Sequence, residues 1–216
     1  MRRDRENTVN VVGKAASVSG RLDKTLQPSI SQKLPSEPIE QDIEHLPGST
    51  RRLAAQLMLP LPIQSLWEVL TDYEQLTKFI PNLESSRILN RNGSTVLLEQ
   101  VGCQKFVGLR FSASVRLELE ELREQGMLRF RMVDGDFRRF EGSWIICLDP
   151  GGIRVRYELL VQACRGMPIA LIEQRLRDDL ATNLRAVALE ALKREAQKLD
   201  AASLTAPELQ PMTIKA

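Results

Sequence analysis

The sequence predicts an α+β domain in which a curved, seven-stranded antiparallel sheet wraps around one long C-terminal helix, with two short helices after the first strand. Residues 85–161 alternate between apolar and charged side chains and are broken only by short turns, which indicates consecutive antiparallel strands. Residues 169–200 carry an apolar stripe at helical spacing and contain neither Gly nor Pro. A chain of 216 residues with 43% apolar residues has the size and composition of one globular domain with an appendage.

The first 47 residues differ in composition from the rest of the chain. All ten aromatic residues come later, and ten of the 21 residues from 27 to 47 are Ser, Pro or Gln. Such a segment cannot bury enough apolar surface to offset its ordering entropy, so residues 1–47 are expected to form a disordered tail that exposes the single histidine, His45. The folded domain should span residues 48–200, and residues 201–216 should form a flexible C-terminal tail.

The domain is expected to begin with a strand and two short helices. In residues 51–59, apolar side chains occupy alternate positions, as in a strand with one buried face. Pro62 suits the first turn of a helix, where no backbone donor is needed, and the apolar residues that follow recur at helical spacing as far as Asp72. A second short helix is predicted over residues 73–79, and Pro81 ends it.

Six further strands are predicted over residues 85–90, 95–102, 106–121, 127–132, 139–148 and 153–161. Turn signals separate them, among them Asn92-Gly93 and Asp134-Gly135, and turns this short join antiparallel strands. One face of each strand is apolar and the other is polar or charged, so the apolar face should meet the core.

A long helix closes the predicted domain. Pro168 precedes it, and its apolar stripe includes Ile172, Leu176, Leu180 and Leu184. At 1.5 Å per residue the helix is roughly 45 Å long, which is enough to lie across the whole sheet. One helical stripe is too narrow to cover the apolar face of seven strands, so the fold leaves a gap that either a ligand or protein side chains must fill.

Three segments of the sequence resemble a known family. They are Pro62-x4-Trp67-x3-Leu70-Thr71-Asp72-Tyr73-x2-Leu76-x2-Phe79-Ile80-Pro81, then Gly135-Asp136-Phe137-x4-Gly142-x-Trp144, and Asn183-Leu184 in the final helix. Over about residues 50–195 the chain resembles the polyketide cyclase/dehydrase branch of the START-like (SRPBCC, Bet v 1-like) superfamily. The resemblance implies a helix-grip fold with a hydrophobic cavity, in a family whose members bind lipids, sterols, quinones or polyketides. Within that branch, the chain is similar to the coenzyme Q-binding START-like proteins and to the bacterial ribosome association toxins.

The resemblance implies a ligand site between the sheet and the final helix. The side chains expected to line it are Phe111, Val115, Phe130, Phe140, Trp144, Tyr157, Ile172, Leu176 and Leu180. The Tyr157 hydroxyl would meet a polar group of the ligand, although the same aromatic residues could equally form a packed core. Gly166 and Met167 precede the helix and are expected to act as a gate, because Gly absorbs backbone changes and Met adapts its shape.

These features predict a non-enzymatic binding or carrier protein for a hydrophobic small molecule such as a lipid or an isoprenoid quinone. No catalytic residue, cofactor or metal ligand is expected, because the chain has one His, no CxxC spacing and no nucleotide-binding loop. Asp72 is expected to cap the second short helix, and Glu173, Asp178 and Asp179 to form a solvated helix face. The alternative, a polyketide cyclase or aromatase-like enzyme, requires acid and base groups inside the cavity.

A second alternative is an interaction protein of the ribosome-association type, which needs a continuous basic surface. The net charge is only +2, and the outer-face arginines share that face with glutamates, so cross-strand ion pairs are expected instead. A nucleic-acid or ribosome partner is therefore disfavoured. The outer-face arginines could still contact anionic lipid head groups, and this alternative stays open. With no secretory signal and no run of about 18–20 apolar residues, the expected location is cytoplasmic, with peripheral membrane contact as an option.

Overall fold

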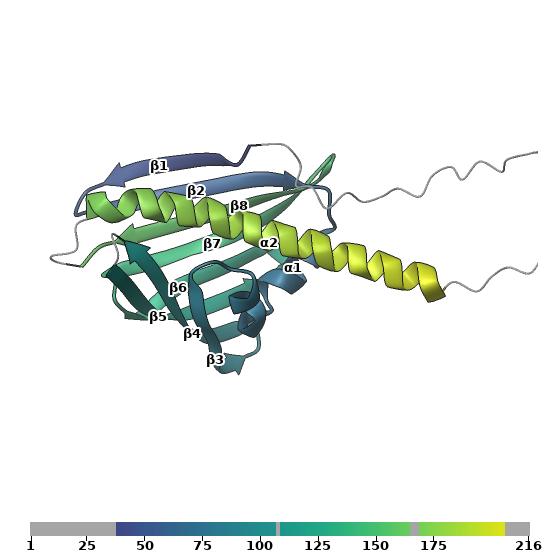
Figure 1. The fold of residues 1–216 in the computed structure, drawn as a ribbon, viewed down its shortest axis with the longest axis horizontal. Helices are drawn as coiled ribbons and strands as arrows, with labels where there is room; N and C mark the ends of the chain where they lie inside the picture. The colour runs from purple at the N-terminus through teal and green to yellow at the C-terminus, as the bar shows by residue number, and fades with distance from the viewer. Residues whose placement is uncertain (1–37, 107–108, 165–168, 206–216) are drawn as a thin grey trace, which may run out of the picture. The chain divides into compact units, whose positions relative to one another are not determined.

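The computed structural model describes residues 38–106, 109–164 and 169–205, which belong to one compact unit spanning residues 31–216. They form an antiparallel sheet, three short helical segments and one long helix (Figure 1). In chain order the elements are β1 (Glu40–Leu46), β2 (Thr50–Leu59), α1 (Ile63–Leu70), η1 (Tyr73–Lys78), β3 (Leu83–Asn92), β4 (Thr95–Phe106), β5 (Leu109–Leu122), η2 (Arg123–Gln125), β6 (Met127–Gly135), β7 (Arg139–Asp149), β8 (Gly152–Gln162) and α2 (Ile169–Thr205). This is the predicted helix-grip arrangement.

The described part of the sheet has eight strands in the order β1-β2-β8-β7-β6-β5-β4-β3, so the predicted count of seven is wrong. The additional strand is β1, which the composition assigns to a disordered tail. All seven of its residues pair with β2, and Ile43 packs against the core. Five of the seven side chains are exposed, which is why no apolar alternation marks this edge strand in the sequence. Residues 1–37 lie outside the described residues.

The final helix also extends beyond its predicted end at residue 200, because α2 continues to Thr205. Ala201 and Ala202 favour helix, and Pro207 is the first residue that would break it. The predicted stripe is confirmed in the middle of the helix, where Leu180, Leu184 and Val187 are almost fully buried. The expected C-terminal tail is therefore wrong for residues 201–205, and residues 206–216 lie outside the described residues.

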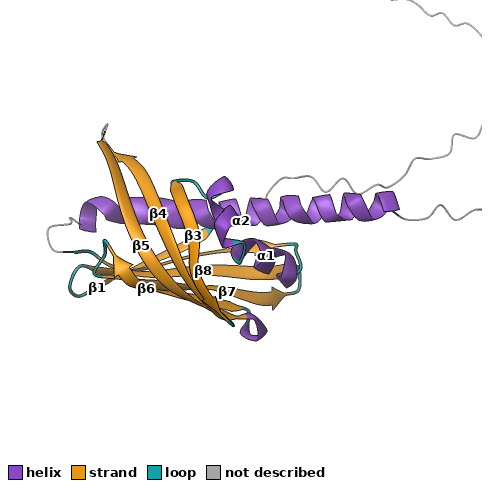
Figure 2. Cartoon of the chain, turned by 90° about the horizontal axis from the view of Figure 1, so that it is seen from below, coloured by secondary structure: helices purple, strands orange, loops and turns teal. Residues whose placement is uncertain are grey.

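The sheet is strongly curved. Figure 2 shows β3, β4 and β5 running across the direction of β7 and β8, with α2 lying along the hollow side. The helix packs mainly against α1 and β2, with further contacts to β1 and β8. We call the side of the sheet that carries Trp144 and Tyr157 the inner face. The helix thus covers the inner face from the β1–β2–β8 edge.

Polar side chains on β1 and β2 hold the first half of α2 in place. The Gln41 side-chain amide donates a hydrogen bond to the Arg177 carbonyl over 3.0 Å. Glu173 accepts a hydrogen bond from Arg51 Nε at 2.6 Å, and its other carboxylate oxygen lies 3.0 Å from His45 Nε2. His45 is exposed, as expected. The strand missing from the prediction is therefore the one that anchors the covering helix.

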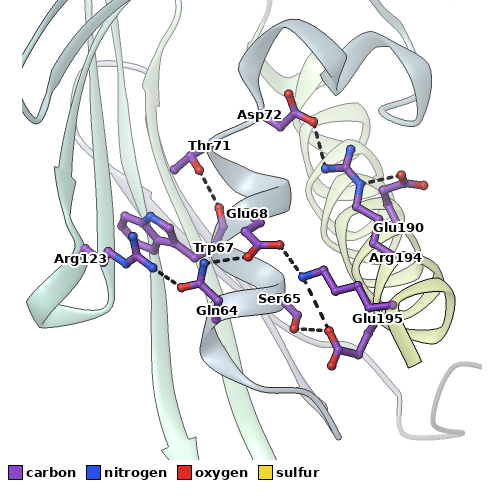
Figure 3. Close-up of polar contacts among 11 residues, drawn as sticks. Gln64, Ser65, Trp67, Glu68, Thr71, Asp72, Arg123, Glu190, Arg194 and Glu195 are labelled. Atoms are coloured by element: carbon purple, nitrogen blue, oxygen red, sulfur yellow. Dashed lines mark hydrogen bonds and ion pairs between the residues drawn. The ribbon is translucent and has the colours of Figure 1, made fainter. Parts of the chain in front are cut away.

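A second polar network joins α1 to the last turns of α2 (Figure 3). The Ser65 hydroxyl donates a hydrogen bond to Glu195, and Lys198 forms an ion pair with Glu68. Ser65 is almost fully buried between the two helices. This contact therefore gives a hydrogen-bond partner to a hydroxyl that would otherwise be buried without one. The helix is thus fixed at both ends, to β1 and β2 at one and to α1 at the other.

Asp72 belongs to the same network, and its predicted capping role is wrong. It occupies the N-cap position of η1, but its side chain makes no capping hydrogen bond. Its carboxylate instead accepts a hydrogen bond from Arg194 of α2 at 2.9 Å (Figure 3). Arg194 is also bonded to Glu190, one turn earlier on the same helix. A guanidinium is a stronger partner for a carboxylate than a neutral backbone donor, which accounts for the difference.

Gly142 of β7 allows close packing at the centre of the inner face. A Cβ at this position would lie 2.0 Å from the Glu158 carbonyl oxygen and 2.6 Å from the edge of the Phe130 ring. The carbonyl belongs to the neighbouring strand β8 and cannot move without opening the ladder. Gly142→Ala is therefore expected to lower the free energy of unfolding by about 1–3 kcal/mol, measured by urea denaturation.

Gly151→Ala is the matched control, because a Cβ at that position meets nothing within 4 Å. Its free energy of unfolding should stay within about 0.5 kcal/mol of the wild type. Equal stability for the two variants would show that β7 and β8 separate easily enough to accept a methyl group.

The contact between Glu173 and Arg51 predicts a pH dependence of stability. The Arg51 hydrogen bond, with a smaller contribution from His45, holds the pKa of Glu173 below its ordinary value of 4.5. The stability that this carboxylate contributes is fully present above about pH 4.5 and is lost as the pH falls through the lower folded-state pKa. The stability advantage of the wild type over Glu173→Gln, measured by urea unfolding at successive pH values, should therefore shrink only below that pH.

Glu44→Gln provides the comparison, because Glu44 and Arg52 form an ion pair in which both side chains are more than half exposed. Exposed pairs contribute about 1 kcal/mol or less, so this variant should follow the wild type at every pH. A Glu173→Gln profile parallel to the wild type throughout would argue against the anchoring role.

Candidate functional site

Four aromatic residues from adjacent strands gather on the inner face. Trp144 and Tyr157 are paired across β7 and β8, and their rings stack with centroids 4.1 Å apart and planes 7° apart. Phe130 of β6 lies 6.2 Å from Tyr157 and 5.9 Å from Phe140, measured between ring centroids. Residues opposite one another on antiparallel strands point to the same side, so the strand register produces this aromatic cluster of Phe130, Phe140, Trp144 and Tyr157.

Most of the predicted lining residues meet in one hydrophobic cluster. The buried members are Val115, Phe130, Trp144 and Leu180, and the partly buried members are Phe140, Tyr157 and Leu176. Phe111 lies in β5 and Ile172 in α2, but their side chains are outside the described residues, as are Gly166 and Met167. The structure therefore brings together seven of the predicted lining residues, and their role towards a ligand stays a prediction.

Phe137 is an aromatic neighbour that the predicted lining set omits. Its ring centroid lies 5.3 Å from that of Phe140, and its side chain is partly buried against the core. The turn before it is fixed by Asp136, whose carboxylate accepts a hydrogen bond from the Ser114 backbone at 2.7 Å. The Gly135-Asp136-Phe137 segment could have predicted this neighbour from the sequence. A Phe that directly follows a turn lies at the end of a strand, so its ring can pack at the edge of the inner face.

The strand register also places α2 above Tyr157. The strand register aligns one residue from each of β1, β2, β8 and β7 in a row across the sheet. We call this the Tyr157 row; its members are Gln41, Ala55, Tyr157 and Trp144. The Gln41 side chain bonds the backbone of α2 at Arg177, so the helix crosses the Tyr157 row near that residue. Asp179 follows within one turn. It lies at the margin of the face defined by Leu176 and Leu180, about 60° around the helix from Leu176.

Burial raises the pKa of the Tyr157 hydroxyl, and the negative charge of Asp179 raises it further. The hydroxyl therefore stays protonated at neutral pH. Tyr157 makes no hydrogen bond to any residue in the described part of the chain, so its donor is available. The result is an aromatic surface that carries one hydroxyl group, on which the negative charge of Asp179 acts.

This position corrects the expectation that Glu173, Asp178 and Asp179 form one solvated face. Asp178 is exposed and accepts a hydrogen bond from Gln174, as a surface residue would. Glu173 instead binds Arg51 on β2, and Asp179 is partly buried with its charge acting on Tyr157. Helical periodicity separates the three residues, because Glu173 falls within the apolar stripe at 176, 180 and 184, Asp179 lies at its margin and Asp178 lies on the opposite side.

The opposite, outer face of the sheet carries the predicted ion pairs, which are confirmed. Arg131 bonds Glu118 at 2.6 Å and Arg116 bonds Glu99 at 3.1 Å, in both cases between neighbouring strands. A groove of about 740 Å³ lies over this face, and its charged lining residues are Arg52, Glu118, Glu120, Arg129, Arg131, Arg139, Glu141 and Glu158. The two signs are interleaved along the groove, so it is not a continuous basic surface.

Two further properties of the described residues bear on other functions. No group of three or more His, Cys, Asp or Glu side chains there is arranged to hold a metal ion. None of the described helices combines the length and the apolar character that crossing a membrane requires.

Comparisons with known proteins agree with this geometry. No curated protein matches the chain. Among solved structures, the STAR-related lipid transfer protein of Xanthomonas axonopodis has a TM-score of 0.61 at 16% identity, covering 74% of this chain and 96% of that protein. A Thermus thermophilus protein, TTHA0849, has a TM-score of 0.59 at 21% identity, covering 66% and 98%. The Zhui aromatase/cyclase of Streptomyces sp. R1128 has a TM-score of 0.53 at 15% identity, covering 71% and 98%.

Similarities at these identities show a shared fold. A family model described as polyketide cyclase / dehydrase and lipid transport matches residues 59–188, which include most of the sheet and the first half of α2. That range is more than half of the 216 residues. The chain therefore belongs to the polyketide cyclase / dehydrase and lipid transport family.

Proposed function

We propose that the protein is a non-enzymatic binding or carrier protein that holds a hydrophobic small molecule between the inner face and α2. One observation carries the proposal. Phe140 and Tyr157 retain accessible surface although they stand within the hydrophobic cluster that forms the core. Aromatic surface of this kind, grouped around one available hydroxyl, is typical of a site for an apolar ligand with a polar group. The family description, which includes lipid transport, supports the same reading.

The energetics of such a site require no catalytic group. Removing about 300 Å² of apolar surface from water contributes about 7.5 kcal/mol at 25 cal/mol per Å². The entropic cost of association reduces this figure, so the net affinity depends on how rigid the site already is. Because α2 is anchored at both ends, much of the ordering cost is met before the ligand binds.

An isoprenoid quinone or a comparable lipid fits this proposal, because it combines a long apolar part with a small polar head. A cytoplasmic location with peripheral membrane contact belongs to the same proposal, since a carrier must reach the membrane that contains such a ligand. Both are inferences from the chemistry of the site.

A second candidate is a cyclase-type enzyme, which the family description and the aromatase/cyclase fold neighbour support equally. The observation in its favour is that the negative charge of Asp179 acts on the buried hydroxyl of Tyr157 and raises its pKa. Against it, general acid–base catalysis works best with a pKa near the working pH, and the pKa of Tyr157 is moved away from neutrality. If purified protein catalysed ring closure of a linear polyketone, monitored by absorbance, the result would support the enzyme function.

The binding function predicts that the gently purified full-length chain carries a lipid. Native mass spectrometry should show a stoichiometric adduct, and organic extraction of the same sample should release an isoprenoid or another apolar molecule. A chain that is ligand-free, and remains so after incubation with lipids and quinones, would indicate that side chains fill the site.

Phe140→Ala tests the location of the site. The neutral dye Nile red should bind the variant about tenfold more weakly than the wild type, since losing roughly 55 Å² of apolar contact corresponds to about 1.4 kcal/mol. Ile145→Ala is the matched control, because Ile145 lies on the same strand and pairs with the outer-face residue Arg156. Equal losses in the two variants, at comparable stability, would place the dye elsewhere.

A further inference from the structure

One row of residues in the outer-face groove interrupts the alternation of charges across the sheet. Arg129 of β6 lies opposite Ser143 of β7, and Ser143 lies opposite Glu158 of β8. All three residues line the groove, and we call them the Ser143 row. Neighbouring strands are about 4.8 Å apart, so the Arg129 and Glu158 backbones are about 10 Å apart, with only a small hydroxyl side chain between them.

The next row along the strands, in contrast, is already neutralised by its own contacts. Arg131 donates two hydrogen bonds to Glu118, over 2.6 and 3.0 Å. Glu141, the ladder partner of Arg131, accepts a hydrogen bond from Arg139 on its own strand. A charged ligand would have to break these bonds to bind there, so the Ser143 row is the more accessible part of the groove.

The Ser143 row retains unused hydrogen-bonding groups. Within the described part of the chain, the only partner of Arg129 is Glu120 at 3.6 Å, which is beyond hydrogen-bonding distance. One carboxylate oxygen of Glu158 accepts a hydrogen bond from Arg156 at 2.6 Å, and its second oxygen has no donor among the described residues. The Ser143 hydroxyl makes no hydrogen bond to them either. The row thus offers N–H donors at one end, a hydroxyl in the middle and a carboxylate oxygen at the other end.

Neither a simple anion nor a simple cation suits this arrangement. An anion at Arg129 would approach the carboxylates of Glu120 and Glu158, and a cation at Glu158 would approach the guanidiniums of Arg129 and Arg156, where like charges repel. A zwitterion that lies along the row meets an opposite charge at each end. A phosphate is a suitable anionic part, because the planar guanidinium matches its oxygens with two parallel N–H groups.

We propose that the Ser143 row binds the zwitterionic head group of a choline or ethanolamine phospholipid, with the phosphate at Arg129 and the ammonium group at Glu158. The guanidinium donates hydrogen bonds to the phosphate oxygens, and the Ser143 hydroxyl can donate one more. The ammonium group lies against the second oxygen of Glu158. The groove is therefore a docking site for a zwitterionic membrane surface.

A membrane is the source of this head group. The Arg129 side chain is more than half exposed, so it can reach a head group that projects from a bilayer. The choice of a lipid over a soluble ester rests on the proposed carrier function, because a carrier of apolar molecules must meet the membrane that contains them. The groove lies on the outer face and α2 packs on the inner face, so docking through the groove would leave the helix uncovered.

Co-sedimentation of the full-length chain with dioleoylphosphatidylcholine vesicles at low salt tests the proposal. The chain should sediment with the vesicles. Glycerophosphocholine should release it at about a tenfold lower concentration than dimethyl phosphate or choline chloride at equal ionic strength, because only the zwitterion adds a second charge-assisted contact. Release by dimethyl phosphate at the same concentration as by glycerophosphocholine would overturn the recognition of a zwitterion.

The outcomes separate this inference from the carrier function. A chain that binds Nile red but neither the vesicles nor glycerophosphocholine, the latter measured by titration calorimetry, would overturn the docking site and leave the carrier function standing. Binding of glycerophosphocholine to a chain that does not sediment with the vesicles would overturn the membrane as the source. A chain that binds the vesicles but no apolar molecule would contradict the carrier function instead.

Variants of the two charged ends locate the site. Arg129→Gln and Glu158→Gln should each weaken vesicle binding about tenfold, the effect of losing one hydrogen bond to a charged group. The controls are Arg87→Gln and Asp134→Asn, which alter exposed, ion-paired side chains outside the groove lining and should bind as the wild type does. Equal losses in the variants and the controls would show a general charge effect and overturn the assignment.

Ser143 tests the space between the charges. Ser143→Leu should prevent glycerophosphocholine from releasing the chain selectively, because the larger side chain occupies the floor of the groove. Ser143→Ala keeps the space and should weaken binding by about fivefold at most, the effect of one neutral hydrogen bond. Wild-type binding by Ser143→Leu, with a free energy of unfolding in urea close to that of the wild type, would rule out the Ser143 row as the site.

Discussion

A sheet with one apolar face is stable only if another element covers that face, and in this chain α2 is the element that does so. Its position depends on polar contacts at both ends, from Gln41, His45 and Arg51 to the first half and from α1 to the last turns. Between these anchors the apolar stripe buries Leu180, Leu184 and Val187. The candidate site exists because the helix is held along one edge of a curved sheet, over β1, β2 and β8.

Much of this arrangement follows from local sequence patterns. Alternation located β2 to β8 because each strand has one face in the core and one in water, and the pairing of outer-face arginines with glutamates followed from the same alternation. The aromatic cluster was predictable for a related reason. Once the strand register is set by short turns, Trp144 and Tyr157 must become neighbours, and Phe130 follows one strand away.

The features that escaped prediction depend on long-range partners. Strand β1 has no alternation of its own and is defined by the edge of β2 that it pairs with. Asp72 has the position of a helix cap, but its partner is Arg194, which is 122 residues away in sequence. Asp179 looks like a surface carboxylate when its charged neighbours are considered, and the structure shows it partly buried, with its charge acting on Tyr157 of β8.

The anchoring of α2 by β1 has a consequence for where this domain truly starts. Composition places the boundary near residue 48, and a protein truncated there would retain the whole of the family match at residues 59–188. It would nevertheless lose Gln41 and His45, and with them two of the three polar contacts that hold the first half of α2 over β1 and β2. The structural unit is thus longer than the recognisable one, and a segment with the composition of a linker supplies the edge strand that holds α2.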